Sequence, residues 1–367
     1  MNPIKNTDAK PKVVVLKALG YSGATWVSLV LGSHPDALCV GPCDRIWKLK
    51  KEEADLACLI HYKECSFWPG FVRTWDRNKN FILELAEYSK KKLFILYVPT
   101  EEMTENVLRH PALDVRYLKV LRDGRAQIFS AMRHHAKRAW SCREAVLHWF
   151  LPAFLRLEKW NPPDDNPVLW LRYEDMVHQT GQEIARLGDF IGIRYPHHAV
   201  RYWEFEQHLV AGNTGTIDLL RKLQGLEGFR HHRSDFYNEA FKKTVADKDR
   251  PIIDESWREH LNREDLFLYD YYAGKIHEQY GYPRDIFSEQ ERSAYLEKYH
   301  LPAEFDAHSA KYQIKRLAPL QSFRRQSAGF YVKKYTTGLR QSLLDLFDRS
   351  KKWLRRPKVR RNKGVSA

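Results

Sequence analysis

A segment rich in glycine and hydroxyl side chains directly follows the first apolar run of the chain. The run spans residues 13–16, and the sequence GYSGATW of residues 20–26 comes just before an apolar stretch with the composition of a helix. Backbone N–H groups at a helix N-terminus bind anions, and glycine allows backbone conformations that a side chain forbids. Ser22 and Thr25 can add hydroxyl donors. The segment therefore predicts a phosphate-binding loop, although connecting turns of similar composition are common.

The same loop lacks the lysine that marks nucleoside-triphosphate sites. Those sites have the pattern G-x-x-x-x-G-K-[ST], in which the lysine reaches the β- and γ-phosphates. Here Ala24 follows Gly23. An ATPase or kinase is therefore disfavoured, and a kinase of unusual sequence remains an alternative that would need Mg²⁺.

Two later segments carry groups that could complete a nucleotide site. Arg122 follows the apolar run of residues 115–121, and Ser130 lies eight residues farther on, inside a helix predicted to begin near Gly124. A guanidinium and a hydroxyl in that arrangement can converge on one phosphate. Tyr173 follows another apolar run, and its ring could stack on a base. Taken singly, a surface arginine, a capping serine and a core tyrosine are the more ordinary interpretations.

In this order the three segments resemble the sulfotransferases that use 3′-phosphoadenosine 5′-phosphosulfate (PAPS). The family loop [RK]-S-G-[TS]-[TS]-W holds the 5′-phosphosulfate and corresponds here to Tyr21, Ser22, Gly23, Ala24, Thr25 and Trp26. The second motif, R-[DN]-P-[RK]-x5-S, holds the 3′-phosphate and corresponds to Arg122, Asp123, Gly124, Arg125 and Ser130, with glycine in place of proline.

Further segments extend this resemblance over residues 12–284. The segment RYED puts Tyr173 at the position that meets the nucleotide in the family. Weaker signatures of carbohydrate-type and bacterial sulfotransferases are HLVAGNTG, which contains Asn213, and the later segments DESWREHLN and YGYP.

The resemblance implies transfer of a sulfuryl group from PAPS to an acceptor hydroxyl, for which a carbohydrate is one candidate. Because the donor is already activated, the protein must align the acceptor, accept its proton and stabilise charge on the departing phosphate. This chemistry requires no metal. A protein that binds the nucleotide but has lost transfer is the alternative from the class of binding proteins.

Two departures from the family pattern concern the catalytic groups. The family carries Lys or Arg directly before the Ser-Gly pair, whereas this chain has Tyr21, which is uncharged near neutral pH. Lys17 could replace the missing charge if it reaches from the end of its strand toward the loop. The base is expected after the second strand, where Asp44 is the nearest carboxylate, and His61 is the next candidate.

A separate group of residues raises the question of a metal. Cys58, His61 and Cys65 are close in the sequence, but their spacing matches no common zinc pattern. A fourth ligand would have to come from Cys39 or Cys43. We therefore expect ordinary buried thiols and no metal.

Alternating strands and helices must position these residues. Short apolar runs rich in β-branched residues are residues 13–16, 38–40, 93–98, 115–121 and 168–171, and a helical stretch follows most of them. The alternation predicts repeated βαβ units, and therefore an α/β fold of three layers with a mainly parallel sheet flanked by helices. Helices are predicted over about residues 144–160, with an interruption or kink at Pro152, and over residues 180–191.

The resemblance makes this fold the P-loop NTPase-like fold of sulfotransferases. The expected domain spans residues 12–285 and lies between an N-terminal tail, residues 1–11, and a C-terminal extension, residues 286–367. We expect that extension to be basic and partly helical or disordered.

The net positive charge of the chain comes entirely from the extension. Residues 311–367 hold 17 Lys and Arg against two Asp, a net charge of +15 that equals the +15 of all 367 residues. Nucleic-acid binding is therefore not expected of the domain, whereas the extension could touch an anionic membrane or a glycan. The polar start of the chain, the lack of a long apolar stretch and an odd count of five cysteines predict a cytoplasmic protein.

Overall fold

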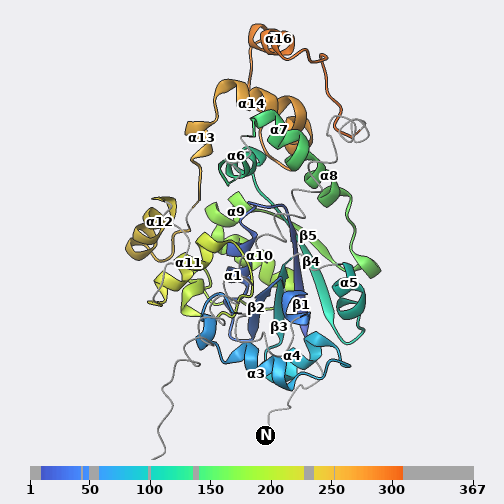
Figure 1. The fold of residues 1–367 in the computed structure, drawn as a ribbon, viewed down its shortest axis with the longest axis vertical. Coiled ribbons are helices and arrows are strands. Elements are labelled where there is room, and N and C mark those ends of the chain that lie inside the picture. Colours follow the sequence, from blue (N-terminus) through green and yellow to red (C-terminus); the bar gives the residue numbers. More distant parts are fainter. Residues whose placement is uncertain are drawn as a thin grey trace, which may run out of the picture. The chain divides into compact units, whose positions relative to one another are not determined.

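A parallel five-stranded sheet forms the centre of the protein (Figure 1). The structure is a computed structural model that describes residues 10–42, 44–48, 58–97, 101–134, 140–226, 235–251 and 253–308. The strand order is β2-β3-β1-β4-β5, with the bounds β1 (Lys12–Ala18), β2 (Ala37–Gly41), β3 (Leu93–Tyr97), β4 (Asp114–Leu121) and β5 (Val168–Arg172). All neighbouring strands are parallel, and each predicted apolar run coincides with one of them. The predicted α/β architecture is confirmed.

The central strand β1 separates the two halves of the sheet. Its residues 13–16 are buried, and the strand pairs with β3 on one side and with β4 on the other. In open parallel sheets, ligands bind beyond the carboxyl ends of the strands where the strand order reverses. The loop after β1, Arg122 after β4 and Tyr173 after β5 all lie at this edge, because β1, β4 and β5 are neighbours.

Helices connect the strands. The helices between β1 and β4 are α1 (Ala24–Leu31), α2 (Asp44–Trp47), α3 (Phe67–Thr74), α4 (Phe81–Ser89) and α5 (Glu101–Met103). The helices between β4 and β5 are α6 (Gly124–His134), α7 (Cys142–Glu144) and α8 (Leu151–Lys159). The helices after β5 are α9 (Tyr173–His178), α10 (Thr180–Ile191), α11 (Thr214–Leu223), α12 (Asp235–Ala246), α13 (Trp257–His260), α14 (Arg263–Tyr269), α15 (Lys275–Glu278) and α16 (Glu289–Lys298). Short 3₁₀ and π-helical turns are η2 (Tyr62–Glu64), η3 (Thr104–Leu108), η5 (Ala145–Phe150), η6 (Pro163–Asp165), η7 (Tyr202–Glu204) and η8 (Asp270–Gly274).

The two predicted helices are both present, one of them in pieces. The helix predicted over 180–191 is α10, and it ends at Gly192, whose φ of 73° lies in the left-handed region that glycine adopts most easily. The helix predicted over about 144–160 consists of α7, the π-helical turn η5 and α8. Pro152 lies in the first turn of α8, where a missing backbone N–H is tolerated.

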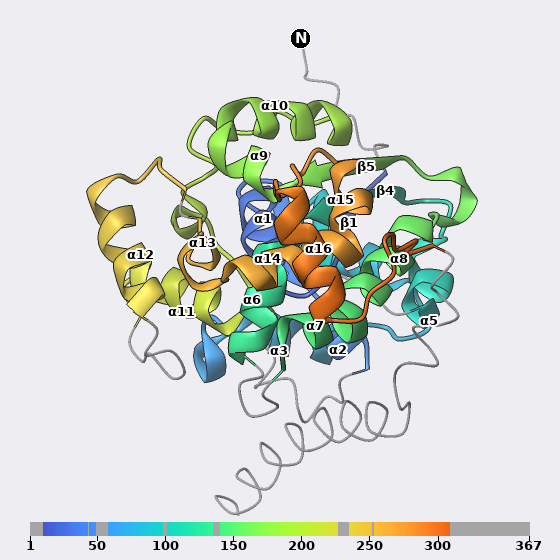
Figure 2. The same ribbon diagram turned by 90° about the horizontal axis from the view of Figure 1, so that it is seen from above.

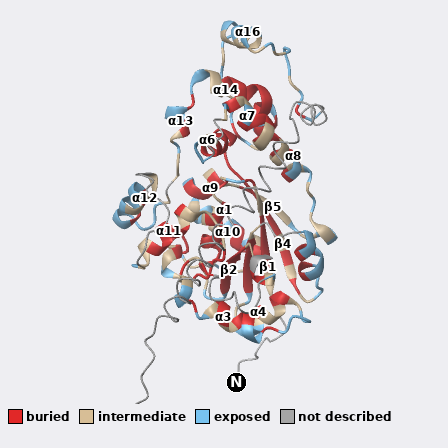
Figure 3. Ribbon diagram, in the orientation of Figure 1, coloured by how far each residue is buried: buried red, intermediate tan, exposed pale blue. Residues whose placement is uncertain are grey.

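Helices of the later chain cover the carboxyl ends of the strands. In Figure 1, α6, α7 and α14 lie above these ends, and in Figure 2, which is seen from above, α6 and α14 lie near the middle of the view. Colouring by burial shows β2, β3, β4 and α6 largely buried and α7 and α14 partly buried (Figure 3), whereas α16 has no buried residue. The covering helices therefore shield the edge where the three predicted segments meet.

The compact unit that contains the sheet continues to His308. The first part of the predicted extension belongs to this unit, because Glu291 pairs with Arg263 at 2.8 Å and Tyr271 donates its hydroxyl hydrogen to the Pro302 carbonyl at 2.8 Å. The basic residues 309–367 and the tail residues 1–9 lie outside the described residues. Among the described helices, none is long and apolar enough to cross a membrane.

Candidate functional site

The loop after β1 has the backbone conformation of a tight anion-binding turn. Gly23 has a φ of 80° and Tyr21 a φ of 60°, and helix α1 begins at the next residue, Ala24. Ser22 is 1 % exposed, and its hydroxyl has no hydrogen-bond partner among the residues that the structure describes. A buried unpaired hydroxyl is costly, and such groups commonly face a ligand. The loop therefore fits an anion at the N-terminus of α1.

Tyr173 packs directly on this loop. A Cβ atom at Gly23 would lie 2.3 Å from the Tyr173 ring, so the close approach requires glycine. The same ring makes an edge contact with Trp26 at 5.6 Å between centroids. Burial raises the pKa of the Tyr173 hydroxyl to about 12, so the group stays protonated and can donate a hydrogen bond.

Arg122 joins the three predicted segments. Its guanidinium donates to the Tyr21 carbonyl at 3.0 Å and to the Asp254 carbonyl at 2.7 Å, and it lies 5.1 Å from the centre of the Tyr173 ring. The Arg122 Nε is buried and lacks a hydrogen-bond partner within the described part of the chain. Arg122 thus contacts Tyr173, about fifty residues away in the sequence, and Tyr21, about a hundred residues away.

The remainder of the second motif forms a buried ionic network. Arg125 pairs with Asp123 at 2.7 Å and with Asp285 at 2.9 Å. Glu174 accepts hydrogen bonds from the Asp123 backbone N–H at 3.0 Å and from the Tyr282 hydroxyl at 2.9 Å, and burial raises its pKa. This network ties β4, β5 and the YGYP segment together. Ser130 is also buried, on the same helix α6 that begins at Gly124.

Asn213 supports the loop from outside through its backbone. Its N–H donates to the Thr25 hydroxyl at 3.0 Å. Its side-chain oxygen caps helix α11 by accepting from the Thr216 N–H at 3.0 Å, and it also accepts from the Tyr237 hydroxyl at 2.8 Å. Asn213 therefore holds the segment 208–213 against α1.

Three side chains outside the predicted site residues contact the loop, and of these the sequence singles out only Trp149, as one of several flat rings suited to an acceptor. Gln127 donates to the Gly20 carbonyl at 2.9 Å. His134 stacks on the Tyr21 ring at 5.2 Å between centroids, and Trp149 packs on the same ring at 5.6 Å. Gln127 precedes Ser130 by three residues, so helical periodicity could have placed both on one face. The sequence carries no comparable signal for the other two.

The two candidate catalytic residues belong to different elements, Lys17 to β1 and Asp44 to α2. The Lys17 ammonium lies over the Trp160 ring at 4.8 Å. Asp44 begins the short helix α2, and its side chain lies outside the part that the structure describes. The catalytic roles of Lys17 and Asp44 stay predictions.

The structure corrects the expected fourth partner of the cysteine and histidine group. Cys58, His61 and Cys65 do gather, but His208 completes the group, with all four ligand atoms within 4.8 Å of one another. Cys39 instead lies buried in β2, and Cys43 is outside the described residues. His208 could not be inferred because 143 residues separate it from Cys65. His61, the second candidate for the base, belongs to this group.

Known structures resemble this chain in part. One is the sulfotransferase domain from the curacin biosynthetic pathway, with 15 % identity, 74 % of this chain and 98 % of that chain covered, and a TM-score of 0.39. Another is mouse sulfotransferase SULT7A1 complexed with PAP, with 13 % identity, coverage of 72 % and 83 %, and a TM-score of 0.38. A third is the sulfotransferase domain of the Synechococcus PCC 7002 olefin synthase, with 18 % identity, coverage of 66 % and 96 %, and a TM-score of 0.38.

Comparison of the sequence with protein families gives a clearer result than these structural similarities. No curated protein matches the chain. Residues 11–266, however, match the sulfotransferase domain family, and this range includes all three segments that meet at the carboxyl edge of the sheet. The chain therefore belongs to the sulfotransferase family.

Proposed function

We propose that this protein transfers a sulfuryl group from PAPS to a hydroxyl of an acceptor. The observation that carries the proposal is the convergence of Arg122, the loop of residues 20–26 and Tyr173 on one edge of the sheet. Two groups of this site, the Ser22 hydroxyl and the Arg122 Nε, are buried without a partner among the described residues, which supports an anionic ligand.

Each part of the site has a role that suits this donor. Ser22, Thr25 and the backbone N–H groups at the start of α1 would hold the 5′-phosphosulfate. Arg122 and Ser130 would hold the 3′-phosphate, which distinguishes PAPS from ATP. The rings of Trp26 and Tyr173 would pack against the bound nucleotide. Bound PAPS supplies an activated sulfuryl group, so the protein contributes alignment, hydrogen bonds to developing charge and removal of the acceptor proton.

A flat acceptor such as a sugar ring is supported by the aromatic side chains around the loop. Tyr21, Trp149 and His134 lie together, and an aromatic face can pack on the apolar face of a sugar. Trp68 and Trp75, by contrast, are buried in the core. For the base, Asp44 is the candidate because it follows β2, the region where the base is expected from the resemblance.

Tyr21 gives a specific reason to keep a second function, nucleotide binding without transfer. The residue replaces the cation that stabilises the leaving oxygen in the family, and its ring is engaged by His134. Removal of one group that stabilises transition-state charge commonly costs about 3–4 kcal/mol in the activation barrier. Such a protein would bind PAPS and PAP and transfer slowly or not at all.

Calorimetric titration tests the nucleotide site. Full-length protein is titrated in chelator-free buffer with 3′,5′-adenosine bisphosphate (PAP), with 5′-AMP, and with ATP in the presence and absence of Mg²⁺. We expect PAP to bind more tightly than 5′-AMP or ATP, because only PAP places a phosphate at the 3′ position. ATP binding that requires Mg²⁺, with no binding of PAP, would contradict the proposal and favour a kinase.

Hydrolysis of PAPS to PAP and sulfate, in which water receives the sulfuryl group, measures the effect of position 21 without a known acceptor. We compare the natural protein with Tyr21→Lys and with Tyr21→Phe as the matched control. If Tyr21 limits transfer, Tyr21→Lys raises the rate of PAP release and Tyr21→Phe does not. Equal rates in all three proteins, with PAP affinity unchanged, would show that position 21 does not limit the reaction.

A further inference from the structure

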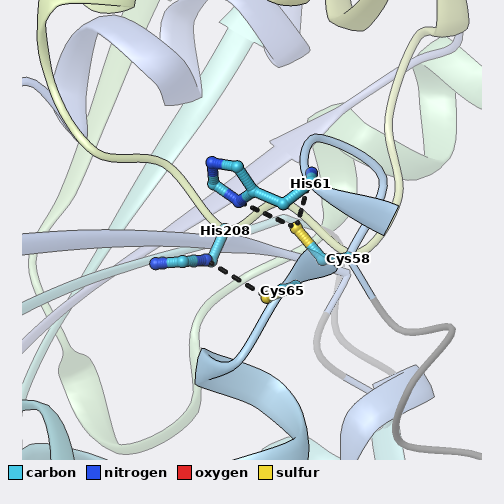
Figure 4. Close-up of side chains that lie close together, drawn as sticks. All are labelled: Cys58, His61, Cys65 and His208. Atoms are coloured by element: carbon cyan, nitrogen blue, oxygen red, sulfur yellow. Dashed lines mark hydrogen bonds between the residues drawn. The ribbon is translucent and has the colours of Figure 1, made fainter. Parts of the chain in front are cut away.

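Two cysteines and two histidines form a compact group away from the nucleotide loop (Figure 4). Cys58 Sγ and His61 Nδ1 are 3.6 Å apart, and Cys65 Sγ and His208 Nδ1 are 3.5 Å apart. Figure 4 shows the four side chains directed toward one another. Cys58, Cys65 and His208 are buried, and His61 is half-buried.

These distances suit four ligands around one small cation. A tetrahedral zinc site has Zn–S distances of about 2.3 Å and Zn–N distances of about 2.0–2.1 Å, which separates neighbouring ligand atoms by roughly 3.3–3.8 Å. The two printed S···N distances fall in this range, and the remaining pairs need little adjustment because all lie within 4.8 Å. Two thiolates and two neutral imidazoles would also balance the charge of a divalent ion in this buried setting.

The surroundings orient the ligands as in known metal sites. His208 turns Nδ1 toward Cys65 and Nε2 toward the Glu206 carboxylate, at 2.8 Å. A carboxylate on the distal nitrogen fixes the tautomer and orientation of a ligating histidine. The His208 ring also stacks on Phe67 at 4.4 Å between centroids. At Cys58, the His61 backbone N–H donates to Sγ at 3.4 Å, which holds the Cys58 side chain next to His61.

We propose that Cys58, His61, Cys65 and His208 bind one Zn²⁺ ion. Soft thiolate and imidazole ligands in a closed group of four favour zinc over Mg²⁺ or Ca²⁺, which prefer oxygen ligands. All four positions are filled by the protein, so the ion is structural and takes no part in sulfuryl transfer. The proposal does not rest on the proposed function.

The ion would connect two distant segments. Residues 58–65 lie between β2 and β3, whereas His208 belongs to the segment 208–213 after α10. The two are already linked by the Leu59 N–H donating to the Leu209 carbonyl at 2.8 Å and by the Trp68 indole donating to the His208 carbonyl at 2.7 Å. The same segment ends at Asn213, whose backbone N–H donates to the Thr25 hydroxyl. Zinc would therefore also stabilise the position of the segment 208–213 against the phosphate loop.

Metal analysis of the full-length protein tests the proposal. Protein purified under reducing conditions is dialysed against metal-free buffer, and zinc is measured by mass spectrometry. We expect close to one zinc per chain in the natural protein and in Cys142→Ala, which removes a buried cysteine outside the group. Zinc content should fall several-fold in Cys58→Ser and in His208→Gln. Folded natural protein that lacks zinc and does not take it up would overturn the proposal.

Cobalt substitution provides the readout if those variants fail to fold. Natural protein stripped of zinc and loaded with Co²⁺ should show the intense visible bands of tetrahedral cobalt and a near-ultraviolet thiolate-to-cobalt band. Weak bands typical of six oxygen or nitrogen ligands would overturn the proposal, as would a Cys58–Cys65 disulfide found by peptide mapping of protein kept from air. Nucleotide binding is not used in either experiment, so a failure of the proposed function leaves their results interpretable.

Discussion

Gly124 stands where the second family motif carries proline, and its surroundings explain the difference. A Cβ atom at this position would lie 2.4 Å from the Tyr269 hydroxyl and 2.6 Å from the Phe150 ring. Neither a proline nor an alanine fits without moving α14 or η5. Glycine therefore allows α6 to begin directly beneath these helices, next to Arg122.

Arg122 is the residue whose replacement tests the nucleotide assignment most directly. Arg122→Ala should weaken PAP binding by about 10- to 150-fold, because a hydrogen bond to a charged group contributes about 1.5–3 kcal/mol. Binding of 5′-AMP should weaken much less, since this ligand has no 3′-phosphate. Calorimetric titration with both ligands measures the two losses.

The matched control is Arg186→Ala, which removes an arginine paired with Glu183 on α10. Its affinities for PAP and 5′-AMP should equal those of the natural protein. Equal losses for both ligands in Arg122→Ala would show that Arg122 supports the loop through the Tyr21 carbonyl and does not read the 3′-phosphate.

At the scale of elements, the contact between α1 and the segment 208–213 depends on one hydroxyl. Thr25→Val keeps the shape of the side chain but leaves the partly buried Asn213 N–H without its acceptor. An unsatisfied buried donor costs about 1–3 kcal/mol. We therefore expect the free energy of unfolding to fall by that amount in denaturant titration.

Thr74→Val is the control for this change. Thr74 lies in α3, and its hydroxyl donates to the Gly70 and Phe71 carbonyls of its own helix, so the substitution leaves no donor unsatisfied. Its effect should stay within about 0.5 kcal/mol. The interpretation of Thr25 fails if the two variants lose the same stability.

The element-scale fold was largely predictable from the sequence. Apolar β-branched runs between helical stretches predicted all five strands, because parallel strands are buried on both faces and carry continuous apolar side chains. An interruption of the helix over residues 144–160 was predicted at Pro152, but the π-helical turn η5 was not, since such a turn arises from local packing. The compact unit extends to His308, because residues 286–308 join it through tertiary contacts.

At the scale of the whole molecule, a buried histidine makes stability depend on pH. His277 is 2 % exposed, stacks on Tyr282 at 4.3 Å, and receives the Tyr269 hydroxyl at Nδ1 at 2.5 Å. Burial lowers its pKa from 6.5 to about 3, although the nearby Asp123 carboxylate opposes the shift. The folded protein therefore holds His277 neutral at pH values where the unfolded chain binds a proton.

This difference destabilises the fold as the pH falls from about 6.5 toward 3. The contribution of His277 is fully present above pH 6.5 and declines below it by up to about 1.4 kcal/mol per pH unit. In His277→Gln, which keeps an acceptor for Tyr269, the loss of unfolding free energy between pH 7 and pH 5 should be smaller. Denaturant titration at both pH values measures it, and identical losses in the two proteins would exclude this role for His277.

The sequence by itself determined the family, the order of the strands along the chain and the motifs from which the nucleotide site is proposed. These features are local: each motif is a few residues long, and each follows a strand whose carboxyl end must lie at one edge of a parallel sheet. Tertiary structure alone decided which distant groups complete the sites. Asp254 joins Arg122, His134 joins Tyr21, and His208 joins Cys65 because the folded chain brings them together. Asp254 and His208 lie in segments that resemble family signatures, but a single sequence does not indicate which distant side chains they contact.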